Sequence, residues 1–223
     1  MAASLTATIH ILRHGQSIHN VVRPYPYRDP PLTDVGVQQA MDIRLPAEPD
    51  LLLISPMTRT IETALLAFPG RLKSGSVKVQ VWPDLREAHG ALCNIGVSRP
   101  ELEAKFPQFD FSSCRNEWDY PPHIFDDAAE RAERVRRRLK DLSASYKNIF
   151  LVTHRAFAAF LVQGERFDVC ECRSYRFASR EEADKARDGI NIDRGIKQDF
   201  GPSVLLPIHP QGGGSGAESS ATG

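Results

Sequence analysis

Short apolar runs that end in polar residues predict four buried strands, and two weaker patterns predict two more. The four runs are Ile9–Leu12, Asp50–Ser55, Val77–Trp82 and Asn148–Thr153. Such runs, bounded by turn residues, are typical of strands buried on both faces of a parallel sheet. The weaker patterns lie at Cys172–Ala178 and Val204–Ile208.

Amphipathic stretches between these runs predict helices. Four of them lie at Val35–Leu45, Arg99–Phe106, Asp126–Tyr146 and Arg155–Val162. A fifth begins after Pro56 and has Ile61, Ala64, Leu65 and Phe68 on one face. Leu32-Thr33-Asp34 offers caps for the first helix, and Asp126 or Asp127 for the longest one. The proline-rich stretch Val21–Pro31 and the charged stretch Glu181–Gly201 are predicted to be surface loops. Alternating strands and helices predict an α/β fold: a three-layer α/β/α sandwich around a mainly parallel sheet.

Composition narrows the class of protein. The 223 residues contain 28 basic and 28 acidic side chains, and this zero net charge argues against a general polyanion binder. Five arginines lie between 131 and 138, but interleaved acidic residues favour a solvated helix face over a nucleic-acid surface. No apolar run has membrane-spanning length and no signal peptide is visible, so we expect a cytoplasmic protein with no membrane partner.

The domain organisation expected is simple. Residues 1–210 are predicted to form a single catalytic domain, and the Gly/Ser-rich residues 211–223 a disordered tail. The four cysteines fit no usual zinc pattern and are expected to be free thiols, without a metal or other cofactor. The oligomeric state cannot be inferred from the sequence.

Candidate chemistry gathers where the predicted strands end. Arg13 and His14 follow the first strand, and Arg59 comes in the first turn of the helix after the second. Glu87 follows the third strand and His154 the fourth. Since the carboxyl ends of parallel strands share one edge of a sheet, we expect these side chains to form one site. Guanidinium groups hold an anion and a neutral imidazole can attack it, so the pattern favours chemistry on an anion.

These motifs, in this order, resemble those of the histidine phosphatase superfamily, which has the phosphoglycerate mutase-like fold. The matching residues are Arg13-His14-Gly15-Gln16-Ser17 with Asn20, Ser55-Pro56 with Arg59-Thr60 and Glu62-Thr63-Ala64, Leu85-Arg86-Glu87, and Val152-Thr153-His154. The resemblance spans roughly residues 7–178. The sequence resembles the small phosphatase branch more than the mutases, because the long substrate-binding insertion of the mutases is not evident.

The resemblance implies roles for these residues. His14 would be the nucleophile that forms a phosphohistidine, and Glu87 the general acid and later the general base. Arg13, Arg59 and His154 would bind the phosphoryl oxygens, and Asn20 would add a neutral donor. A position beside a dianion-filled pocket would raise the pKa of Glu87, as its role as acid requires. The implied activity is metal-independent hydrolysis of a small phosphomonoester.

One residue departs from the family pattern. The second histidine is usually followed by glycine, but here Arg155 follows it. Arg155 could point away from the site, bind a carboxylate or second phosphate of the substrate, or plug the phosphate pocket. Two alternative functions therefore stay open: acid–base chemistry on a non-phosphorylated metabolite, of the isomerase, dehydratase or lyase type, and phosphate binding with little catalysis. Nearby His89, and also His10 and His19, are interpreted as locally bonded histidines.

Overall fold

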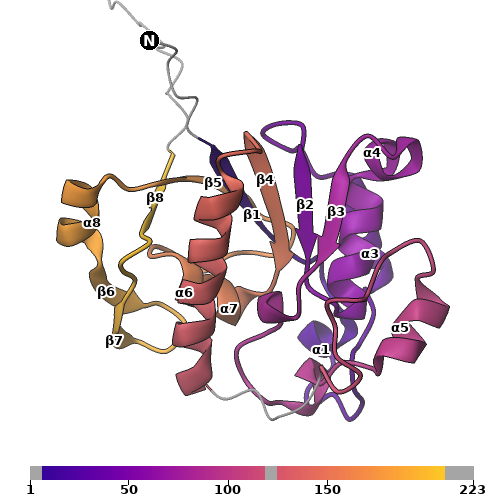
Figure 1. The fold of residues 1–223 in the computed structure, drawn as a ribbon. Coiled ribbons are helices and arrows are strands. Elements are labelled where there is room, and N and C mark those ends of the chain that lie inside the picture. Colours follow the sequence, from indigo (N-terminus) through magenta and orange to yellow (C-terminus); the bar gives the residue numbers. More distant parts are fainter. Residues whose placement is uncertain (1–6, 119–124, 209–223) are drawn as a thin grey trace, which may run out of the picture.

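A six-stranded sheet lies at the centre of the computed structural model, which describes residues 7–118 and 125–208 (Figure 1). The strand order is β3-β2-β4-β1-β5-β8. The strands are β1 (Thr8–Arg13), β2 (Leu51–Ile54), β3 (Lys78–Val81), β4 (Asn148–Thr153), β5 (Cys172–Phe177) and β8 (Leu205–Pro207). The first four are parallel, whereas β5 is antiparallel to β1 and β8 to β5. The predicted, mainly parallel sheet is therefore confirmed.

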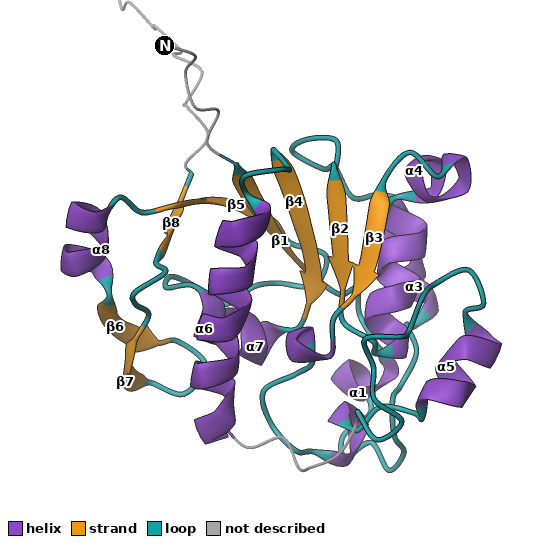
Figure 2. Ribbon diagram, viewed as in Figure 1, coloured by secondary structure: helices purple, strands orange, loops and turns teal. Residues whose placement is uncertain are grey.

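Helices cover both faces of this sheet (Figure 2). They are α1 (Ile18–Val21), α2 (Asp34–Met41), α3 (Thr58–Ala67), α4 (Pro69–Ser74), α5 (Arg99–Lys105), α6 (Phe125–Leu142), α7 (Arg155–Leu161) and α8 (Arg180–Ala186), with 3-10 turns η1 (Pro83–Leu85) and η2 (Leu92–Asn94). Alternation along β1 explains the layers, because successive side chains of a strand point to opposite faces. Ile9 and Ile11 pack in one core with α6 and α7, and Leu12 packs in a second core with α3. The three-layer sandwich is thus confirmed.

Two arginines of α6 are buried, which corrects part of the interpretation of the arginine run. Arg131 donates hydrogen bonds to the carbonyl oxygens of Asp84, Arg86 and Glu87. Arg136 donates to the carbonyls of Phe160 and Leu161 at the end of α7. Each is about 1% exposed. These two residues therefore connect α6 to the elements that carry the candidate site, instead of lying on a solvated face.

Helix α2 ends earlier than predicted, at Met41 instead of Leu45. Beyond Met41 the chain turns so that Ile43 and Leu45 pack against the second core. The buried residues of α2 are Gly36 and Ala40, whereas Met41 is 58% exposed. Thr33 caps this helix as predicted, its hydroxyl oxygen accepting a hydrogen bond from the Gly36 amide.

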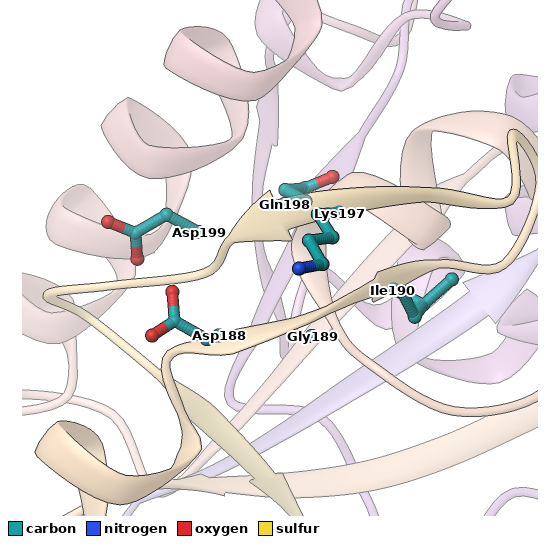
Figure 3. Close-up of a pocket in the computed structure, with 6 residues that line it drawn as sticks. All are labelled: Asp188, Gly189, Ile190, Lys197, Gln198 and Asp199. Atoms are coloured by element: carbon teal, nitrogen blue, oxygen red, sulfur yellow. The ribbon is translucent and has the colours of Figure 1, made fainter.

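The stretch predicted to be a surface loop, Glu181–Gly201, contains α8 and a two-stranded hairpin instead. The hairpin consists of β6 (Asp188–Asn191) and β7 (Ile196–Asp199). Figure 3 shows the two strands, with the side chains of Lys197 and Gln198 pointing in different directions. Gln198 donates a hydrogen bond to the carbonyl of Phe160, which joins the hairpin to α7.

The remaining predicted elements differ little from the observed ones. Helices α5 and α7 and strands β5 and β8 match their predicted ranges to within two residues. Helix α6 begins at Phe125, so Asp126 and Asp127 are inside its first turn and the predicted caps are wrong. The predicted tail, 211–223, lies outside the described residues. Within the described part of the chain, no helix is long and apolar enough to cross a bilayer.

Candidate active site

The strand-end residues gather at one cavity of about 510 Å³ at the carboxyl edge of the sheet. Its lining comprises Arg13, His14, His19, Asn20, Arg23, Pro24, Tyr25, Glu87, His89, Ala91, Leu92, Cys93, Asn94 and Arg155. These residues come from the end of β1 and the residue after it, from α1 and the loop that follows it, from the segment after β3 and from the first turn of α7. Five of the seven site residues predicted from the sequence line it directly, and Arg59 and His154 lie beside it.

The backbone carbonyl of the next residue, Gly15, holds His14 in one tautomer. Its Nδ1 lies 2.7 Å from the carbonyl oxygen of Gly15, which can only accept a hydrogen bond. Nδ1 therefore carries the proton, and Nε2 keeps its lone pair. Burial, together with the charges of Arg59 and Arg13, holds the pKa of His14 well below its ordinary value. The imidazole is thus neutral near pH 7 and suited to nucleophilic attack.

The second predicted histidine faces the first. The ring centroids of His14 and His154 are 5.2 Å apart, and the rings meet edge to face. The Nε2 atom of His154 is hydrogen-bonded to the Ser55 hydroxyl at 2.9 Å, whereas its buried Nδ1 has no hydrogen-bond partner among the described residues. Burial, then the charge of Arg59, lowers the pKa of His154 well below its ordinary value.

Two predicted arginines add positive charge to this centre. Arg13 donates to the carbonyl of Phe167 at 2.7 Å, and Arg59 donates to Asn94 Oδ1 at 2.9 Å and to the carbonyl of Cys93. The Nε of each arginine is buried and has no hydrogen-bond partner within the described chain. Buried unpaired donors are costly in free energy, so these donors together favour the binding of an anion.

Glu87 is fixed by backbone amides. Its Oε1 accepts hydrogen bonds from the amides of Ala88 and Phe157, each at 2.8 Å, and Oε2 accepts one from Ala156 at 3.4 Å. Two of these donors belong to the first turn of α7, so the carboxylate connects the third strand end with the fourth. Arg131 holds the carbonyl of Glu87 from behind. The carboxyl group therefore has a defined position at the cavity wall.

Asn20 lies at the cavity together with His19, for which the sequence predicted only local contacts. Its Oδ1 accepts from the amide of Ser17 at 2.9 Å, and its Nδ2 lies 3.2 Å from His19 Nε2. His19 itself lines the cavity, and burial lowers its pKa to about 3. The local contacts predicted for His19 exist, but its place in the cavity was missed, although it directly precedes a motif residue.

Other lining residues lie in two segments that carry no motif, the proline-rich loop and the segment after β3. Asn94 accepts a hydrogen bond from Arg59 and donates one to the carbonyl of His89. Arg23 and Tyr25 reach the cavity from the proline-rich loop. Tyr27 of the same loop is 68% exposed. No periodicity or motif in the sequence distinguishes these residues from ordinary loop residues.

Gly15 is needed where the loop that carries His14 packs against α2. A Cβ at this position would lie 2.7 Å from the carbonyl oxygen of Gly36, and a Cβ at Gly36 would lie 1.9 Å from the carbonyl oxygen of Gln16. The two glycines let α2 approach the loop that carries His14. Close packing of two backbones, not the approach of a ligand, therefore requires glycine here.

Arg155 lines the cavity without filling it. Its Nε lies 3.0 Å from Asp193 Oδ1, in the turn that joins β6 to β7. Asp193 also pairs with Arg166 at 3.6 Å. The cavity has room beside Arg155, which argues against the interpretation in which this side chain plugs the pocket.

A second hollow, of about 540 Å³, lies over the hairpin (Figure 3). It is lined by Asp188, Gly189, Ile190, Lys197, Gln198 and Asp199, and none of the strand-end residues reaches it. Among residues 7–118 and 125–208, no three His, Cys, Asp or Glu side chains cluster as metal ligands would. The four cysteines form no disulfide bond.

The α/β sandwich thus carries two facing histidines, His14 and His154, beside a cavity lined by arginines at the carboxyl edge of its sheet. The model of the histidine phosphatase superfamily, branch 1, matches residues 9–166. The chain therefore belongs to this superfamily, as its motifs predicted.

Individual relatives carry phosphatase and mutase-like names. A Schizosaccharomyces pombe protein named as a probable phosphatase is 35% identical over 123 residues, which cover 51% of this chain and 56% of that protein. The chain thus spans little more than half the length of this relative. An Arabidopsis thaliana phosphoglycerate mutase-like protein is 28% identical over 231 residues, covering 84% of this chain and 85% of that protein.

Solved structures share the fold. The α-ribazole phosphatase from Shigella flexneri has a TM-score of 0.56 at 23% identity, covering 77% of this chain and 91% of that one. The ecdysone phosphate phosphatase from Bombyx mori, in complex with tungstate, has a TM-score of 0.57 at 18% identity, covering 76% and 89%. At these identities the likeness establishes the fold alone.

Proposed function

We propose that this protein is a metal-independent phosphatase that hydrolyses a small phosphomonoester through a phosphohistidine on His14. The observation that carries the proposal is the hydrogen bond from His14 Nδ1 to the Gly15 carbonyl. It directs a neutral, buried lone pair on Nε2 toward a cavity lined with cationic side chains. Phosphatase-named relatives support the same activity.

In the first step, Nε2 of His14 attacks phosphorus while the bond from phosphorus to the ester oxygen breaks. Arg13, Arg59 and His154 bind the phosphoryl oxygens, and their donors offset the charge of the transition state. Glu87 gives its proton to the leaving alkoxide. In the second step water attacks the phosphohistidine, Glu87 takes the proton of that water, and inorganic phosphate leaves.

Hydrolysis of p-nitrophenyl phosphate tests this proposal. We expect phosphate release that is insensitive to EDTA and that falls at least about 1,000-fold in His14→Asn, because the nucleophile is lost. His10→Asn is the matched control, since His10 lies on β1, the strand that precedes His14, where it is hydrogen-bonded to Ser174 and Asn148 and does not line the cavity. Thermal unfolding of both variants separates loss of chemistry from loss of fold.

Two outcomes would contradict the proposal. Phosphate release that survives in His14→Asn would exclude this histidine as the nucleophile. Complete inactivity of the folded wild-type protein toward p-nitrophenyl phosphate and a panel of phosphate esters would favour the alternatives without phosphate hydrolysis.

A further inference from the structure

The cavity carries more positive charge at its wall than a single phosphate group requires. Among the described residues that line it, three guanidinium groups, those of Arg13, Arg23 and Arg155, face one carboxyl group, that of Glu87. Arg59 adds a fourth guanidinium from beside the cavity. A phosphomonoester brings a charge of about −1.5 to −2 near pH 7. The excess favours a ligand with a further negative charge.

Arg13 and Arg155 lie at different depths. Arg13 is 8% exposed and its guanidinium is near His14, whereas the side chain of Arg155 is 41% exposed at the rim. The two are near enough that Arg155 contributes, after burial, to lowering the pKa of Arg13. A phosphate held at the depth of His14 and Arg13 therefore leaves Arg155 for a group at the opposite end of a small ligand.

Asp193 holds Arg155 without neutralising it fully. The one carboxylate of Asp193 pairs with both Arg155 and Arg166, so the group of three keeps a net positive charge. The contact with Arg155 uses its Nε. In the part of the chain that the structure describes, the terminal nitrogens of Arg155 donate no hydrogen bond. A guanidinium fork with free terminal donors matches a carboxylate or a phosphate.

The turn that carries Asp193 is anchored from below. Asn191 is fully buried, and its Oδ1 accepts hydrogen bonds from the amides of Asp193 and Arg194, each at 3.1 Å. Its Nδ2 donates to the carbonyl of Ala159 in α7, the helix that Arg155 begins. The hairpin and the helix therefore fix both members of the ion pair, and Arg155 needs little ordering to bind a ligand.

We propose that Arg155, positioned by Asp193, binds a second anionic group of the substrate, so that the enzyme prefers small phosphomonoesters with a carboxylate or a second phosphate. This inference rests on the proposed phosphatase function and names its substrate class. Arg23 is also cationic, but it is exposed in the loop after α1 and no anchored carboxylate pairs with it among the described residues.

Matched substrates test the preference. 3-Phosphoglycerate and glycerol 1-phosphate differ only in a carboxylate against a hydroxymethyl group, and glycerol 1,3-bisphosphate carries a second phosphate instead. We expect the wild-type kcat/KM to be at least about tenfold higher for 3-phosphoglycerate, for glycerol 1,3-bisphosphate or for both than for glycerol 1-phosphate. Charge-assisted hydrogen bonds account for such factors. Comparing 3-phosphoglycerate with glycerol 1,3-bisphosphate shows whether a carboxylate or a second phosphate is preferred.

Variants assign the preference to Arg155. In Arg155→Gln the ratio should fall to about one, mainly through KM, and Arg155→Lys should keep part of it because the charge remains and the fork is lost. Arg71→Gln is the matched control, since the Arg71 side chain is 42% exposed and pairs with Glu48 away from the cavity, and its ratio should equal that of the wild type. Thermal unfolding checks that each variant is folded.

A binding measurement distinguishes failure of this inference from failure of the proposed function. Calorimetric titration of His14→Asn with 3-phosphoglycerate, glycerol 1,3-bisphosphate and glycerol 1-phosphate gives the affinity ratios without turnover, and Arg155→Gln in that background should abolish any preference. Equal affinity for the three compounds would overturn the inference even if p-nitrophenyl phosphate is hydrolysed. A preference that survives in Arg155→Gln or disappears in Arg23→Gln would also overturn it.

Discussion

At the scale of single residues, the loop that presents His14 depends on two facing glycines. Gly15 and Gly36 allow the backbone of α2 to approach residues 15 and 16 more closely than any side chain would permit. The sequence singled out Gly15 because of its place beside His14. It gave no sign that Gly36, an ordinary helix residue by position, is the partner of this loop.

Substituting Gly36 by alanine should therefore destabilise the protein. The new Cβ would lie 1.9 Å from the Gln16 carbonyl oxygen, which is backbone and cannot rotate away. We expect a loss of about 2 kcal/mol or more in the free energy of unfolding and a Tm lower by about 4 °C or more. Gly70→Ala is the control, because a Cβ there meets nothing within 4 Å. An unchanged Tm in Gly36→Ala would contradict this packing.

At the scale of elements, the long helix α6 connects the elements that carry the candidate site. Arg131 and Arg136 of α6 are five residues apart, and they bind the segment that ends in Glu87 and the end of α7, respectively. The sequence predicted the helix from its apolar stripe. It could not predict which arginines are buried, because a buried and a solvated arginine have the same local pattern.

Loss of Arg136 should therefore cost far more stability than loss of its neighbour. Arg136→Met removes the hydrogen bonds to the carbonyls of Phe160 and Leu161 and the close ion pair with Glu133. The Phe160 carbonyl keeps its hydrogen bond from Gln198, whereas the Leu161 carbonyl loses its arginine donor. We expect a loss of about 3 kcal/mol or more. The side chain of Arg137 is 64% exposed, and its contact with Glu133 is long, at 3.9 Å. Arg137→Met should therefore change the free energy of unfolding by less than about 0.5 kcal/mol. Chemical denaturation measures both, and similar losses would refute the assignment.

The C-terminal hairpin marks the limit of pattern-based prediction for elements. Ser179 and Glu182 form a capping box at the start of α8, and this signal was present in the sequence. Strands β6 and β7 are mostly exposed, so they lack the apolar alternation that identifies a buried strand. Their role in holding Asp193 against Arg155 follows only from contacts between residues that are 38 positions apart.

At the scale of the whole molecule, burial of histidines predicts how stability depends on pH. Burial lowers the pKa of His10, His14, His19 and His154 from 6.5, for His19 to about 3. Below pH 6.5 the unfolded chain therefore binds more protons than the folded one, and the free energy of unfolding falls as pH falls. Asp29 and Glu62 act in the opposite direction, because burial raises their pKa.

Urea unfolding between pH 7.5 and 5.0 checks this balance. We expect stability to decrease below about pH 6.5, by at most about 1.4 kcal/mol per pH unit for each titrating histidine. His19→Gln should reduce the slope, since one of the four groups is removed. Stability that stays constant or rises toward pH 5 would show that the two carboxyl groups outweigh the histidines.

The sequence by itself determined the layers of the fold, the order of the strand-end motifs and the superfamily. These features follow from local apolar periodicity and from residues adjacent in the chain, which act over a few positions. Only the tertiary structure decided that Gly36 packs on the loop of His14, that His19 and Asn94 reach the cavity, and that Asp193 meets Arg155. Each of these contacts joins distant segments through side-chain or backbone packing, and the physical reason for it exists only once the sheet has brought those segments together.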